Sequence, residues 1–148
     1  MNKSKVNLSQ TVPTLSIRGV HLWESWLTSV KQRQMLEDIR TVVRQAPLFE
    51  PVTSAGKKMS VRMTSAGCLG WITDRSGYRY EQNHPNGKKW PPIPQSIIEV
   101  WEMLSGSSRG PDCCLVNFYQ NSARMGMHQD RDEVDFTQPV VSISLGDE

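Results

Sequence analysis

The amino-acid sequence predicts an α+β fold that is mainly β, with helices packed on one face. Segments with the two-residue alternation of β-strands outnumber the two segments whose apolar residues recur at helical spacing. The strands do not alternate regularly with helices, which argues against a doubly wound parallel sheet. With 148 residues, the chain is long enough for a single domain that buries its own core.

The composition indicates a soluble globular protein. Apolar residues make up 37% and charged residues 22%, and no apolar run approaches the roughly 18 residues of a membrane span. The stretch MNKSKVNLSQ lacks the apolar core of a signal peptide, so we expect a cytoplasmic protein. The net charge of +2 is too small to indicate nucleic acid by itself. Cys68, Cys113 and Cys114 are interpreted as reduced core thiols, because three cysteines cannot all pair.

The N-terminal third predicts a flexible end (1–12), a short strand and a long helix. Residues 14–20 (TLSIRGV) have the composition of a strand. The amphipathic helix should end before Pro47, because a proline disfavours helical backbone at the residue before it. The apolar stripe that predicts this helix consists of Trp23, Trp26, Leu27, Val30, Leu36, Ile39 and Val43.

The middle of the chain changes to a β pattern. In residues 58–67 (KMSVRMTSAG), apolar side chains alternate with polar ones and predict a strand. Residues 68–80 (CLGWITDRSGYRY) predict a hairpin, because DRSG supplies turn residues between two β-favouring runs. A loop follows over 83–95, with a helix from Pro94 to a C-cap at Gly106. Two further strands are expected at 113–120 and 139–146.

Between these last two strands, the stretch RMGMHQDRDEVD (124–135) contains one histidine and four carboxylates within twelve positions. In extended backbone, His128 and Asp130 point to the same side because one residue separates them. At this spacing two members of a 2-His-1-carboxylate triad bind one face of Fe(II). The alternative is a surface histidine in an acidic loop, because a pair at this spacing also arises by chance.

Longer stretches around this pair resemble the AlkB family of Fe(II)- and 2-oxoglutarate-dependent nucleic-acid dealkylases. The resemblance is carried by NFYQNSARMGMHQDRDEVDFTQPVVSISLG (117–146), MSVRMTSAGCLGWITDRSGYRY (59–80) and WPPIPQ (90–95). It runs from about Pro47 to Gly146 in one order, and it is fainter over the N-terminal third. It implies a double-stranded β-helix (jelly roll) with buttressing helices and a nucleotide-recognition lid.

The same resemblance implies one domain over 13–148, with the lid at 50–92 and the first part of the jelly-roll core, including the iron motif, at 112–148. It makes His128 and Asp130 the metal ligands. Asn117 and Tyr119 would contact 2-oxoglutarate, and an amide and a phenol are suitable donors to a dicarboxylate. The implied substrate-binding residues are Trp71, Tyr78, Asp132, Met59, Met63 and Thr53.

Within this last set, Trp71 and Tyr78 would lie beside the damaged base or its backbone, since aromatic faces hold an unstacked base. By resemblance, Asp132 reaches the exocyclic amino group or ring edge of the base, and Thr53 contacts phosphate. Met59 and Met63 would line the lid. These roles have ordinary structural alternatives: core packing for Met59, Met63 and Tyr119, and a turn position for Asn117. Glu133 and Asp135 are interpreted as solvated loop charges.

A complete site in this family also has a second histidine and two arginines from a later strand, and this sequence stops at Glu148. His21 and His84 remain, but His21 is expected to open a helix and His84 lies in the turn sequence NHPNG. The explanations are a truncated or frameshifted reading of a longer gene, an expressed fragment, or a natural short protein without catalysis. We expect truncation, because the pattern holds up to Gly146.

The expected function is oxidative dealkylation repair of N-alkylated bases in DNA, or in RNA, using Fe(II), O2 and 2-oxoglutarate. We expect little activity from these 148 residues alone. The expected partner is alkylated single- or double-stranded DNA, or RNA, with no membrane and a monomeric state. Two alternatives stay open: a non-catalytic remnant that binds single-stranded nucleic acid, and a 2-oxoglutarate oxygenase acting on a protein or small molecule.

Overall fold

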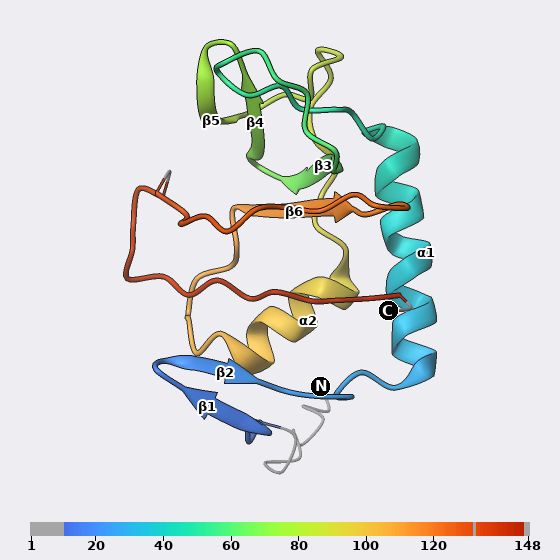
Figure 1. Cartoon of the computed structure of the whole chain (residues 1–148). Coiled ribbons are helices and arrows are strands. Elements are labelled where there is room, and N and C mark those ends of the chain that lie inside the picture. The colour runs from blue at the N-terminus through green and yellow to red at the C-terminus, as the bar shows by residue number, and fades with distance from the viewer. Residues whose placement is uncertain (1–10, 132, 147–148) are drawn as a thin grey trace.

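The computed structural model describes residues 11–131 and 133–146, which form an α+β fold as predicted (Figure 1). Three two-stranded antiparallel sheets are formed by β1 with β2, β3 with β6, and β4 with β5, and these described strands do not close into a barrel. The strands are β1 (Leu15–Ile17), β2 (Val20–Leu22), β3 (Arg62–Gly67), β4 (Gly70–Asp74), β5 (Gly77–Glu81) and β6 (Cys113–Phe118). The helices are α1 (Ser29–Gln45) and α2 (Gln95–Leu104).

The N-terminal segment differs from its prediction because a turn interrupts it. Arg18 and Gly19 have φ values of 51° and 84°, in the left-handed region that tight hairpin turns require. The single strand expected at 14–20 is therefore a hairpin, β1–β2. Accordingly, His21 lies in β2 and does not open a helix.

Helix α1 begins later than its apolar stripe suggested. Thr28 is the N-cap, and its hydroxyl accepts a hydrogen bond from the Lys31 amide at 3.3 Å, so Trp23 and Trp26 precede the helix. The predicted end before Pro47 is confirmed, because α1 ends at Gln45. Its buried residues are Met35 and Val42, which form one narrow line along the helix. Val30 of the predicted stripe is 65% exposed.

Strand β3 is the most buried strand, and β6 pairs along its whole length. Residues 63–66 are all buried, and the Thr64 hydroxyl donates to the Ala46 carbonyl at 2.8 Å, which anchors the strand to the end of α1. The strand begins at Arg62 and not at residue 58, because the chain before it folds back: the Met59 amide donates to the Pro51 carbonyl. The pair Met63 and Asn117 stands in register across β3 and β6.

The β4–β5 hairpin confirms the turn predicted at DRSG. The Ser76 amide donates to Asp74 Oδ1 at 2.8 Å, and the Arg79 guanidinium donates to both Asp74 carboxylate oxygens at 2.9 Å. The Arg79 bonds, and then the Ser76 amide, lower the pKa of Asp74 from 3.8 to about 2. The hairpin is thus closed by a bidentate ion pair at its turn.

Acidification is expected to weaken this turn. Because folding lowers the pKa of Asp74, its contribution to stability is complete above 3.8 and is lost as the pH falls through about 2. Asp74→Asn should therefore destabilise the protein at neutral pH, and the difference from wild type should shrink over that range. Urea unfolding followed by tryptophan fluorescence measures this difference. A difference that stays constant down to pH 2 would contradict the role of the carboxylate.

The hairpin rests on a small core centred on Trp90. Trp90 is 6% exposed and packs with Ile72 and Ala46, and its indole nitrogen donates to the Glu81 carbonyl at 2.9 Å. Gly70 lies directly under the indole ring, where an added Cβ would overlap Trp90. This contact locks the base of β4 against the loop that leads into α2.

Two other expectations are corrected by the structure. Residues 139–146 do not form a strand within the described part of the chain; Figure 1 shows them as an extended segment without an arrow. An extended segment becomes a strand only when a neighbour takes up its backbone hydrogen bonds. All three cysteines are free, but Cys68 is exposed and is not a core thiol. Burial raises the pKa of Cys113, and that of Cys114 to about 11.

The second helix confirms its predicted cap. Helix α2 follows Pro94 and ends at Leu104, and Gly106 has a φ of 66° just beyond it. No helix within the described ranges is long and apolar enough to span a membrane.

Candidate metal centre

His128 and Asp130, which are two residues apart in the sequence, also have their side chains close together in the structure. His128 Nε2 and Asp130 Oδ1 lie 3.4 Å apart, and their side chains are 55% and 61% exposed. His128 Nδ1 lies 2.9 Å from the Gly126 carbonyl, which can only accept, so Nδ1 carries the hydrogen. In the neutral ring the lone pair is then on Nε2, the nitrogen that faces the carboxylate. This is the orientation of a metal-binding histidine.

The donor pair fits a first-row divalent metal ion. Neighbouring ligands in six-coordinate geometry lie about 3 Å apart when each bond is about 2.1 Å long. The 3.4 Å between Nε2 and Oδ1 is close to that spacing. Imidazole with carboxylate is also the donor combination of non-haem Fe(II) sites. His128 and Asp130 would therefore hold such an ion on one side of the loop.

A third ligand does not join them within the described residues, where no group of three histidine, cysteine or carboxylate side chains could hold a metal. His84 is buried, and both its ring nitrogens are engaged: the Asn86 amide donates to Nδ1, and Nε2 donates to the Pro47 carbonyl. His21 bonds to Ser16 in the β1–β2 hairpin, at the opposite end of the molecule from β4–β5 (Figure 1).

The two residues predicted to contact 2-oxoglutarate lie at the end of β6. Asn117 is the penultimate residue of the strand, and Tyr119 directly follows it, 52% exposed. Within the described part of the chain, neither side chain makes a hydrogen bond, so the amide and the phenol are available as donors. Their exposure excludes the alternative of Tyr119 as core in this structure, while the cofactor role stays a prediction.

The two predicted base-contacting aromatics are brought together by the β4–β5 hairpin. Trp71 and Tyr78 stack with ring centroids 5.5 Å apart and planes 24° from parallel. Tyr78 is 49% exposed and Trp71 is half-buried. About half of the Tyr78 side chain is therefore open to solvent.

The remaining predicted substrate-binding residues are placed less uniformly. Met63 is fully buried in β3, and Met59 is half-buried before it. Thr53 closes the turn at 53–57, where its hydroxyl accepts from the Lys57 amide at 3.2 Å. Asp132 lies outside the described residues. The burial of Met63 matches its alternative interpretation as core, and the substrate roles of all four residues stay predictions.

Sequence reasoning missed the contact between the hairpin and the metal motif. Tyr80 Oη donates to Glu133 Oε1 at 2.6 Å, so Glu133 is not a solvated loop charge. Burial of the phenol, and then the bond to Glu133, raises the pKa of Tyr80 above its usual value. Asp135 instead caps a local turn, because the Thr137 hydroxyl and then the Thr137 amide donate to its carboxylate and lower its pKa. No local pattern pairs residues this far apart, so the sequence carried no signal for Tyr80.

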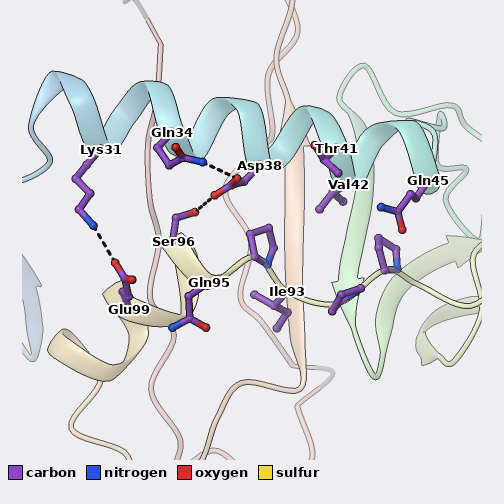
Figure 2. Close-up of a pocket in the computed structure, with 13 residues that line it drawn as sticks. Lys31, Gln34, Asp38, Thr41, Val42, Gln45, Ile93, Gln95, Ser96 and Glu99 are labelled. Atoms are coloured by element: carbon purple, nitrogen blue, oxygen red, sulfur yellow. Dashed lines mark hydrogen bonds and ion pairs between the residues drawn. The ribbon is translucent and has the colours of Figure 1, made fainter. Parts of the chain in front are cut away.

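A groove of about 510 Å³ lies elsewhere, between α1 and α2 (Figure 2). Lys31 bonds to Glu99 across it, and Ser96 bonds to Asp38. None of the predicted site residues lines this groove. It is part of the packing of the two helices and is separate from the metal motif.

Comparison with known proteins identifies the family. Residues 19–148 match the model of the 2OG-Fe(II) oxygenase superfamily. An alpha-ketoglutarate-dependent dioxygenase AlkB homolog of Caulobacter vibrioides is 45% identical over 136 residues, which are 91% of this chain and 62% of the relative. The chain belongs to the AlkB family.

Other AlkB-family relatives agree. The alpha-ketoglutarate-dependent dioxygenase AlkB of Escherichia coli is 42% identical over 118 residues, covering 76% of this chain and 55% of its own length. A DNA N(6)-methyladenine demethylase, ALKBH1D of Arabidopsis thaliana, is 30% identical over 153 residues, covering 87% and 34%. This AlkB-family chain thus spans about three fifths of the length of the bacterial relatives it matches. The family implies a jelly-roll fold.

Proposed function

We propose that this protein takes part in oxidative dealkylation of N-alkylated bases in DNA, and in RNA as an alternative, using Fe(II), O2 and 2-oxoglutarate. The observation that carries the proposal is the His128–Asp130 pair, in which Nε2 faces the carboxylate at 3.4 Å. The Trp71–Tyr78 stack and the membership of the AlkB family support it.

In this proposal the chain binds and orients the reactants. His128 and Asp130 hold Fe(II), which together with 2-oxoglutarate and O2 supplies oxidation of the alkyl carbon. Asn117 and Tyr119 donate hydrogen bonds to 2-oxoglutarate from the end of β6. Trp71 and Tyr78 hold the extruded base by its face, with Met59 and Met63 beneath and Thr53 at a phosphate. Asp132 accepts from the exocyclic amino group of the base.

The finer organisation is also proposed. Residues 50–92 act as a nucleotide-recognition lid, and residues 112–148 form the first part of a jelly roll that further residues complete with a second histidine and an arginine. The share of the relatives that this chain spans supports such a completion. We further propose a monomeric, cytoplasmic protein that works without a membrane; sedimentation and cell fractionation test these points.

The test joins residues 1–146 to the part of the Caulobacter vibrioides relative that lies beyond the matched region. Succinate and demethylated base are measured with an oligonucleotide carrying N-methylated adenine or cytosine, and with its unmethylated twin. We expect both products from the methylated strand alone. Equal succinate formation with the methylated and the unmethylated strand would favour an oxygenase acting on a protein or small molecule. The added segment alone is the control.

A second candidate is a non-catalytic module that binds single-stranded nucleic acid. Two observations favour it. Among the described residues no group of three possible metal ligands is found, and the Trp71–Tyr78 stack can hold a base without a metal. It predicts salt-dependent binding that is indifferent to Fe(II). The dealkylase proposal predicts instead that a methylated strand binds better than its unmodified twin.

Both candidates predict that Trp71→Ala weakens binding of single-stranded DNA. Stacking on an aromatic side chain contributes about 1–3 kcal/mol per base, so the dissociation constant should rise about five- to hundredfold. Fluorescence anisotropy of a labelled oligonucleotide at fixed salt measures it. Trp23→Ala, beyond the distant β1–β2 hairpin, is the matched control. An equal loss in both variants would point to a general effect on folding.

A further inference from the structure

The metal motif is attached to the β4–β5 hairpin by one well-formed contact. Tyr80 lies in β5, in register with Trp71 of β4, and its hydroxyl donates to Glu133 at 2.6 Å across 53 residues of sequence. A phenol that donates to a carboxylate makes one of the stronger hydrogen bonds in proteins, because the acceptor is charged. The bond therefore joins the strand beneath the aromatic stack to the segment that follows Asp130.

The other described residues of this segment make hydrogen bonds only with one another. Among the described residues of 125–134, His128 bonds to Gly126, and Arg131 bonds to Gln129, all within the segment. No backbone hydrogen bond ties these described residues to another element. Before the segment, Arg124 bonds to Ser60 through its backbone. Among the described residues, the loop is thus bonded to other elements at Arg124 and at Glu133.

We propose that Tyr80 is a positioning residue, which through Glu133 holds His128 and Asp130 in place against the hairpin that carries Trp71 and Tyr78. The phenol is protonated across the physiological range at its ordinary pKa, and burial raises that pKa further, so it remains a donor. The aromatic stack and the donor pair then move as one unit. A ligand that orders either of them orders the other, because the same bond is formed in both cases.

This inference rests on the proposed function only where it calls the pair a metal site. The role of the Tyr80–Glu133 hydrogen bond is tested without metal, by 15N relaxation of the whole chain. In wild type, backbone order parameters of 128–131 and 133 should be near the rigid value of about 0.85, and in Tyr80→Phe they should fall below about 0.6. Glu133→Ala should behave like Tyr80→Phe. Glu133→Gln keeps the acceptor oxygen and should restore most of the order.

Tyr78→Phe is the matched control, since it removes a hydroxyl from the same strand that makes no hydrogen bond within the described residues. Order parameters that are the same in wild type and Tyr80→Phe would overturn the proposal. So would a loss of equal size in Tyr78→Phe, or a Glu133→Gln segment as mobile as that of Glu133→Ala.

A second measurement separates this inference from the proposed function. Mn2+ is added, and the broadening of the His128 and Asp130 signals is followed. Tyr80→Phe should need roughly tenfold more Mn2+ than wild type, since a hydrogen bond to a charged group is lost. Wild type that shows no broadening at these residues counts against the metal site, and the relaxation result still decides the role of Tyr80. Broadening at equal Mn2+ in both proteins counts against Tyr80 alone.

Discussion

Replacing His128 with alanine should abolish succinate formation in the completed enzyme, with a fall in kcat/KM of more than about a hundredfold. Changing a residue that merely orients a metal ligand costs about 10- to 100-fold, so removal of the ligand itself should cost more. Both metal affinity and turnover should fall, because Asp130 would remain as a single ligand whose side chain is 61% exposed to solvent.

The measurement is succinate release, together with Mn2+ titration of the same protein. His21→Ala is the matched control: it removes an exposed histidine whose ring bonds only to Ser16 in the β1–β2 hairpin, among the described residues. It should leave both readings as in wild type. Full turnover by His128→Ala would refute the assignment of the iron motif, and with it the dealkylase proposal.

The second large effect concerns stability. Gly70→Ala should destabilise the protein by about 3–5 kcal/mol, which is comparable to deleting a buried tryptophan side chain. The added Cβ would occupy the position of the Trp90 indole, so the ring must leave its place over β4. Its hydrogen bond to the Glu81 carbonyl and its packing on Ile72 would be lost with it. Such a cost is a large share of the stability of an ordinary domain.

Chemical denaturation measures this difference. Gly110→Ala is the control, because an added Cβ there meets no atom within 4 Å and the backbone needs no left-handed conformation. It should change the free energy of unfolding by no more than about 0.5 kcal/mol. If Gly70→Ala unfolds at the same denaturant concentration as Gly110→Ala, the hairpin does not depend on the Trp90 contact.

The sequence determined by itself the features that local chemistry decides. The turn at DRSG, the end of α1 before Pro47 and the Gly106 cap each depend on a few neighbouring residues, and the structure confirms them. The paired orientation of His128 and Asp130 is local in the same way, because it needs only extended backbone and one intervening residue. Family resemblance then supplied the site roles that spacing alone left open.

Contacts between residues far apart in sequence were decided by the tertiary structure. The narrow buried line of α1 runs through Met35 and Val42 because β3 and α2 approach from that side, and the apolar stripe could not indicate this. Whether 139–146 becomes a strand depends on a partner for its backbone. Tyr80 meets Glu133 because the fold brings β5 next to a segment 53 residues away in sequence, and partial burial then strengthens that bond.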